Sequence, residues 1–129
     1  MKLSEYFEQA MGTGVLATTD LSGLVNQAIY AKPHFLEKDD ERTCSFVMTN
    51  GLTHDNVGHN PRASYLFIEQ GEGYVGKRLS LIVTEEEIDP EKIKIKVIRF
   101  CTDLRISEED SKNLVHFRIK GVRPLIGNE

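Results

Sequence analysis

The feature that most constrains the fold of this chain is a series of short β-prone runs that turn signals separate, with no helix regularly placed between them. Asp20-Leu21-Ser22-Gly23 is such a turn and predicts a hairpin between the first two runs. Closing an antiparallel sheet removes its exposed edges, so the pattern predicts a mainly β antiparallel barrel with appended helices. The six runs are GVLATTD (14–20), LVNQAIYAKPHFLE (24–37), RTCSFVMTN (42–50), ASYLFIEQ (63–70), RLSLIVTEEE (78–87) and NLVHFRIKGVRPLIG (113–127).

Two of these runs show the alternation of a half-buried strand. In residues 42–50, Cys44, Phe46 and Met48 fall on one face. In residues 113–127, the apolar face holds Val115, Phe117 and Ile119, and the polar face holds His116, Arg118 and Lys120.

Two segments predict helices outside the sheet. Residues 4–11 carry apolar side chains at helical spacing, with Ser4 as the expected cap, Gly12 as the expected stop, and one end of the barrel as the expected docking place. The apolar residues of 89–100 fit both the alternation of a strand and the spacing of a helix. Asp89 as N-cap, Pro90 at the first helical position and a hydrophobic staple from Ile88 to Ile93 favour a helix.

Length and composition narrow the class of protein. A chain of 129 residues predicts one domain, 1–129. A net charge of -4 with scattered Lys and Arg argues against nucleic-acid binding. The acidic N-terminus and the lack of a long apolar stretch predict a cytoplasmic protein that does not span a membrane. Cys44 and Cys101 are expected to be buried free thiols.

The polar residues give weak support to metal or hydrolytic chemistry. Of the four histidines, only His54 and His59 are close in sequence, and their five-residue offset places them on different faces of a helix. No nucleophile, base and acid can be grouped from sequence alone. Three consecutive glutamates, residues 85–87, are expected to be solvated. We therefore predict no metal site and nominate no catalytic residue.

The segment MTNGLTHDNVGHNPRAS (48–64) is the most informative one for function. A strand ends there, Gly51 allows close approach of a ligand, and Thr53 stands near the start of a short helix whose free N–H groups favour an anion. The alternative is that Thr53 only caps its own helix and Asn56 is a surface amide. The residues alone leave both interpretations open.

The order of these runs resembles the flavin-binding split-barrel family related to pyridoxamine 5'-phosphate oxidase. The most specific part is Thr53-x-x-Asn56-Val57-x-x-Asn60-Pro61, which lies between the third and fourth runs, and the likeness covers nearly the whole chain. It implies a six-stranded antiparallel split β-barrel with short helices, and a homodimer with FMN at its interface.

The resemblance also implies which residues meet the cofactor. On the second strand, the positions matched to the flavin ring are Asn26, Gln27 and Ala28. The positions matched to the phosphate are Thr49, Asn50 and Thr53, and Asn56 belongs to the same motif.

At the phosphate, the chain departs from the family. Many members carry Lys or Arg beside the threonine, where this chain has Leu52 and His54. We expect His54 to donate to the phosphate. A positive charge for the phosphate is also expected from a residue farther along the chain: Lys32, Arg62, Lys77 or Arg78, with Lys77 and Arg78 preferred.

The resemblance implies an FMN-dependent oxidoreductase or electron carrier whose partner is a small molecule or a protein. Family members that oxidise pyridoxamine 5'-phosphate continue into a C-terminal substrate-binding segment, so that activity is not expected of a chain ending at Glu129. The alternative is a non-catalytic binding module for haem, a deazaflavin or a regulatory ligand.

Overall fold

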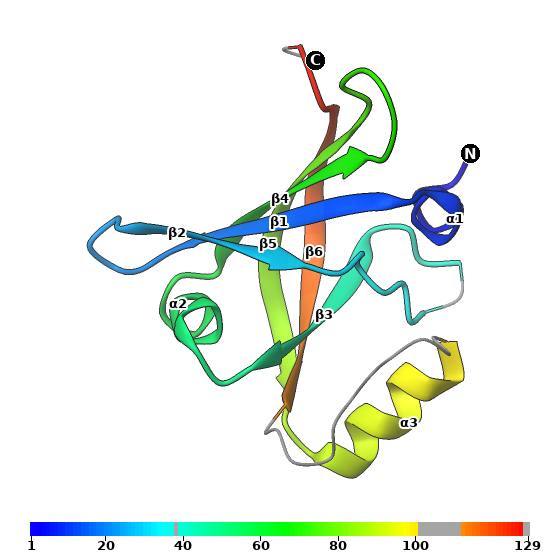
Figure 1. Ribbon diagram of the computed structural model, residues 1–129. Coiled ribbons are helices and arrows are strands. Elements are labelled where there is room, and N and C mark those ends of the chain that lie inside the picture. Colours follow the sequence, from blue (N-terminus) through cyan, green and yellow to red (C-terminus); the bar gives the residue numbers. More distant parts are fainter. Residues whose placement is uncertain (38, 101–111, 128–129) are drawn as a thin grey trace.

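A computed structural model describes residues 1–37, 39–100 and 112–127, and it shows one curved six-stranded antiparallel sheet with three short helices around it (Figure 1). The predicted fold class is confirmed. The strand order in the sheet is β2-β1-β4-β5-β6-β3. The strands are β1 (Gly12–Thr19), β2 (Val25–Tyr30), β3 (Thr43–Thr49), β4 (Arg62–Glu69), β5 (Gly76–Glu87) and β6 (Lys112–Pro124).

The two ends of this sheet meet at a single point beyond β2. His34 and Ser45 exchange backbone hydrogen bonds of 2.8 Å in both directions, which forms an isolated antiparallel bridge. In the described part of the chain, the edges of β2 and β3 are not otherwise paired with each other. The barrel is therefore closed by one bridge and open along the rest of that seam.

The hairpin predicted between the first two strands is confirmed, with Ala17 opposite Gln27 in its register. The Asp20 carboxylate accepts hydrogen bonds from the N–H groups of Ser22 and Leu24, and Gly23 has a φ of 90°. These contacts form the turn, because a carboxylate can satisfy the free N–H groups of a tight loop.

The interior of the barrel is largely aromatic. Phe46, Tyr65, Phe67 and Phe117 are each buried, and the ring of Phe46 lies 5.1 Å from that of Tyr65. Helix α1 (Leu3–Gln9) closes one end, as predicted, by inserting Phe7 with its ring 5.4 Å from Phe67.

The predicted ends of α1 are wrong. The helix begins at Leu3 with Lys2 as its N-cap, and the Ser4 N–H donates instead to the Glu41 carboxylate at 2.8 Å. It ends at Gln9, where Ala10 is extended. Gly12 is the first residue of β1 and not the stop of α1. A Cβ there would overlap the carbonyl oxygen of Ile68 on the neighbouring strand, so the position requires glycine.

Helix α3 (Pro90–Phe100) confirms the helical interpretation of residues 89–100. The Asp89 carboxylate accepts a hydrogen bond of 3.0 Å from the Glu91 N–H, which confirms the cap. The predicted staple is wrong, since Ile88 stays 68% exposed while Ile93 is buried. Ile93 packs with Leu36 and Leu114 in a second, smaller core on the outside of the sheet.

The alternations predicted for residues 42–50 and 113–127 also hold. Cys44, Phe46 and Met48 are buried in the barrel, and Phe117 is buried between the exposed Arg118 and the half-buried His116. Burial raises the pKa of the Cys44 thiol to about 12, which keeps it protonated and unreactive. Cys101 lies outside the described residues.

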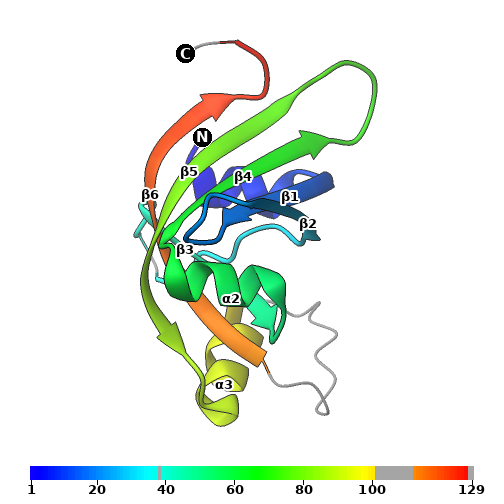
Figure 2. The same cartoon turned by 90° about the vertical axis from the view of Figure 1, so that its left-hand side faces the viewer.

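Helix α2 (Leu52–His59) lies beside the open seam, near the end of β1 that is far from α1 (Figure 1), and it faces the viewer in Figure 2. It connects β3 to β4. None of the helices in the described part of the chain is long and apolar enough to cross a membrane.

Two glycines provide a matched test of packing. A Cβ on Gly14 would overlap the buried hydroxyl of Tyr65, which is held by a 3.1 Å bond to the Ala31 carbonyl, whereas a Cβ on Gly58 would meet open space. Gly14→Ala should lower the free energy of unfolding by about 2–3 kcal/mol, the cost of overpacking. Gly58→Ala should raise it by about 0.5–1 kcal/mol, because alanine is the better helix former. Urea unfolding of both variants tests this, and a stable Gly14→Ala would contradict the packing.

Candidate functional site

The open seam contains a cavity of about 480 Å³. Its walls are residues 28–31 at the end of β2, Val47 and Thr49 of β3, and residues 51–53 at the start of α2. None of these residues carries a charged side chain. The cavity is thus a neutral site with small or apolar walls, the hydroxyls of Tyr30, Thr49 and Thr53, and the backbone of a strand edge.

Helix α2 is held against β1 by two hydrogen bonds between amides and hydroxyls. Asn56 Nδ2 donates to Thr18 Oγ1 at 3.1 Å, and Asn60 Nδ2 donates to Thr19 Oγ1 at 2.7 Å. Asn56 is 4% exposed, so the interpretation of this residue as a surface amide is wrong. Asn56 and Asn60 fix the position of the helix that forms one wall of the cavity.

Thr53 links the same helix to β2 and is not its cap. The N-cap is Gly51, which makes no side-chain cap bond, so the interpretation that Thr53 only caps α2 is wrong. Asn26 Nδ2 donates to Thr53 Oγ1 at 3.2 Å. Burial raises the pKa of the Tyr30 phenol, and a hydrogen bond with Thr53 partly offsets that rise. Tyr30 is therefore a neutral hydroxyl beside Thr53 at physiological pH.

The structure brings together only part of the set of residues expected at the cofactor. Ala28, Thr49 and Thr53 line the cavity. Asn26 does not line it but donates a hydrogen bond to Thr53, which does. Gln27 alternates to the exposed outer face of β2.

Asn50, which was expected at the phosphate, follows β3 and is bound to the neighbouring strand. Its Oδ1 accepts a 2.9 Å hydrogen bond from Asn113, the residue that is paired with Met48 in the sheet.

The positively charged residues expected at the phosphate lie away from the cavity. Lys77 lies with its ammonium 4.6 Å from the centre of the Tyr6 ring. Arg78 donates to the carbonyls of Pro124 and Gly127 at 2.9 and 2.5 Å.

Lys32 and His54 are also engaged elsewhere. Lys32 donates to the Ala10 carbonyl at 2.9 Å. His54 Nε2 contacts the Glu86 carboxylate, so the side chain next to Thr53 is turned toward β5.

Tyr30 is the main residue of the cavity wall that the sequence analysis did not select. The period-2 alternation of β2 places it on the same face as Asn26 and Ala28, so that pattern could have identified it. Leu52 and Val47 were also not selected, because apolar walls carry no motif.

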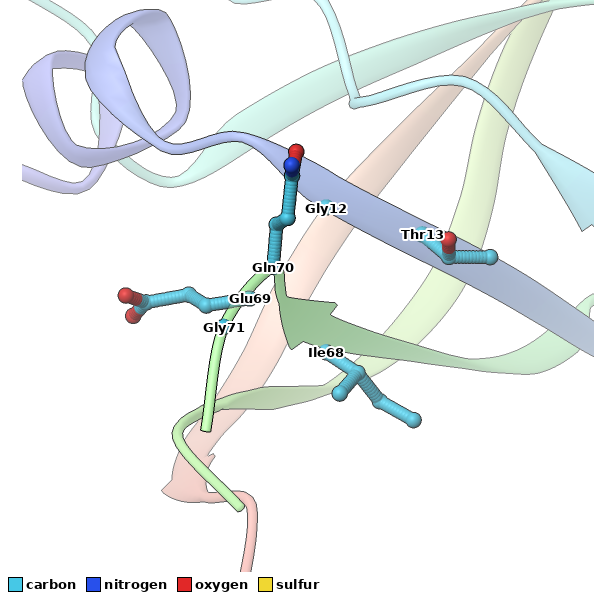
Figure 3. A pocket seen from close by; sticks show the side chains of 6 residues that line it. All are labelled: Gly12, Thr13, Ile68, Glu69, Gln70 and Gly71. Carbon is cyan, nitrogen blue, oxygen red and sulfur yellow. The ribbon is translucent and has the colours of Figure 1, made fainter. Parts of the chain in front are cut away.

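A second hollow, of about 410 Å³, lies at the opposite end of β1 and β4 (Figure 3). It is lined largely by the backbone around Gly12 and Gly71 and by Glu69. The Glu69 carboxylate accepts a 2.6 Å hydrogen bond from Tyr6. Burial and Glu69 both raise the pKa of Tyr6, so this phenol stays protonated at neutral pH and its proton is already bound by Glu69. The hollow therefore presents fewer free side-chain hydrogen-bonding groups to a ligand than the seam cavity does.

Ser45 and His116 form a close serine–histidine pair, with Oγ and Nδ1 2.6 Å apart. Ser45 is only 2% exposed, so no substrate can reach its hydroxyl. The described residues contain no cluster of three metal-ligating side chains.

Comparison with known proteins shows the fold. No family model matches the chain, and no curated protein matches it in sequence. An FMN-binding protein from Syntrophomonas wolfei is similar in structure, with a TM-score of 0.77 and 14% identity over 99% of this chain and 86% of that one. An F420 reductase has a TM-score of 0.67 and 15% identity over 95% and 98%.

A Listeria innocua protein described as a candidate pyridoxamine 5'-phosphate oxidase has a TM-score of 0.66 and 18% identity over 94% and 93%. At these identities the likeness shows the fold alone. The resemblance to the split-barrel flavoproteins inferred from the sequence is thereby confirmed at the level of the fold.

His116 gives a pH prediction. Burial lowers the pKa of His116, while nearby Glu85 opposes that shift. The unfolded chain therefore binds more protons than the folded one as pH falls through the ordinary histidine range, and stability should fall with it. Replacing His116 with Gln should reduce that slope, by at most about 1.4 kcal/mol per pH unit, the limit for one proton.

Urea unfolding between pH 7.5 and 5 measures the slope for both proteins. Burial also lowers the pKa of His34, so some slope should remain in the variant. An unchanged slope would show that His116 titrates alike in the folded and unfolded states.

Proposed function

We propose that this chain is a flavin-binding protein related to pyridoxamine 5'-phosphate oxidase, and that FMN lies in the seam cavity. The observation that carries the proposal is the unpaired edge of β2. In the described part of the chain, this strand has one neighbour in the sheet, β1, and the cavity lies along its other side. Free backbone N–H and C=O groups there suit the polar edge of a planar heterocycle.

The residues present fit such a ligand. Ala28 is small enough for a ring to approach the backbone, and Val47 gives an apolar wall. The hydroxyl of Thr53 and the first N–H groups of α2, which have no acceptor within a helix, suit the phosphate. Among the described residues, no positively charged side chain lines the cavity, so a phosphate there would depend on these neutral donors.

When bound, the flavin would supply hydride or electron transfer. The chain would bind the ring, orient it and exclude water. Positioning alone can support hydride transfer, so no side-chain base is required. The proposed class is an oxidoreductase or electron carrier with a small-molecule or protein partner.

A homodimer is part of the proposal. In the register of the sheet, Ile29 of β2 lies beside Val15 of β1, and Val15 lies beside Leu66 of β4, which gives an apolar row on the outer face. Ile29 is 72% exposed and also lines the cavity. A second copy on this face would bury the row and cover the mouth of the cavity at the same time.

A non-catalytic module for haem, a deazaflavin or a regulatory ligand is the second candidate. The lack of a cationic wall favours it, because a phosphate gains most from Lys or Arg. An absorption spectrum of the purified protein distinguishes flavin from haem.

Thr53 provides the test of the flavin proposal. The protein should bind one FMN per chain in a calorimetric titration. Thr53→Ala should weaken FMN by about 1.5–3 kcal/mol, the worth of a hydrogen bond to a charged group, and leave riboflavin nearly unchanged. Thr53→Ser keeps the hydroxyl and should bind FMN almost as the wild type does. No heat with either flavin would refute the proposal, and an equal loss for both would move the phosphate elsewhere.

Ile29 tests the interface. Ile29→Lys places a charge in the apolar row and should shift the protein from dimer to monomer in light scattering, with weaker FMN binding. Ile95→Lys is the control, because Ile95 is similarly exposed, at 65%, on α3. A monomeric wild type with full affinity for FMN would exclude an interfacial site.

A further inference from the structure

His54 follows Thr53 in the sequence and was expected to bind the phosphate. Its side chain instead contacts Glu86. Strand β4 begins with Arg62 opposite Ile82, so β5 continues past β4 toward α2. Glu86 lies on that extension and contacts His54 Nε2. The two side chains are 21% and 34% exposed, so the pair is partly shielded from solvent.

Two carboxylates lie near the start of α2. Glu86 stands beside the first turn, and Asp55 lies within it. The positive end of a helix dipole is therefore already shared with two carboxylates. A phosphate bound at the same helix end would be repelled by both carboxylates, one of which contacts His54.

We infer that Glu86 is a specificity-determining residue of the seam cavity. By holding His54 and placing a carboxylate beside α2, it lowers affinity for a phosphorylated flavin relative to the same flavin without phosphate. The inference rests on the proposed flavin site, and it concerns only the tail of the ligand. The ring end of the cavity lies along β2 and has no charged side chain.

Neighbouring glutamates give a matched pair of variants. Glu86→Gln removes the charge that faces His54. Glu85→Gln removes the same charge from the adjacent residue, which is paired with His116 on β6 and is a neighbour of that histidine. Both variants change the net charge equally, so any general effect of charge is shared.

The experiment measures dissociation constants of FMN and riboflavin by fluorescence titration at low salt. Glu86→Gln should tighten FMN by about five- to tenfold, as expected when one nearby like charge is removed from a partly screened site, and change riboflavin less than twofold. Glu85→Gln should leave both ligands within twofold of wild type. At 1 M NaCl the gain should largely disappear, because salt screens charges over a few ångströms.

A second variant checks the role of the histidine. His54→Gln should weaken FMN relative to riboflavin while Glu86 is present, and should have a smaller effect in the Glu86→Gln background. Thermal unfolding of each variant confirms that the fold is intact.

An unchanged ratio of FMN to riboflavin affinity in Glu86→Gln would overturn the inference while leaving the flavin site in place. An equal gain in Glu85→Gln would also overturn it. Binding of neither flavin by any variant would refute the proposed function itself, and the inference with it.

Discussion

The seam cavity depends on the hydrogen bonds that hold α2 in place. A helix of eight residues is too short to be stable by itself in water, so its position must come from contacts with the sheet. Val57 supplies apolar burial, and Asn56 and Asn60 bind the hydroxyls of consecutive threonines on β1. Because Asn56 and Thr18 are both buried, losing one partner would leave the other unsatisfied. The wall of the cavity is therefore fixed by directional bonds as well as by packing.

The cavity exists because the barrel, as far as residues 1–37, 39–100 and 112–127 show it, closes at only one point. If β2 and β3 paired along their full length, their backbone groups would satisfy one another and leave no room between them. The bridge from His34 to Ser45 lies beyond the end of β2 instead. The unpaired edge of β2 is a hazard in an isolated chain, because it can pair with another strand. A ligand or a second copy along this side would cover it.

The sequence predicted the elements well where local chemistry decides them. The alternation in β3 and β6, the turn at Asp20 and the Asp89-Pro90 start of α3 all appear in the structure. The start of α1 was predicted wrongly, because Glu41, far away in sequence, binds the N–H of Ser4. Its end was predicted wrongly because Gly12 pairs with Glu69 of β4.

The candidate site was predicted in part, for a related reason. The motif located the segment around Thr53, but spacing cannot tell which face of α2 meets the cavity. His54 follows Thr53 directly and yet contacts Glu86, which is 32 residues away. Arg78 was selected for its charge, and it binds two carbonyls near the end of β6 that no local pattern could have indicated.

The Tyr30 and Thr53 hydroxyls can be considered as one donor group. Thr53 has one O–H and two lone pairs, and Asn26 uses one of the lone pairs. If Tyr30 donates to Thr53, the proton of Thr53 is left over. If Thr53 donates to Tyr30, the proton of Tyr30 is left over. In both arrangements one O–H remains for an acceptor, and both hydroxyls line the cavity. The pair thus presents a single neutral donor that can be directed from either oxygen, which suits a ligand with an acceptor near the start of α2.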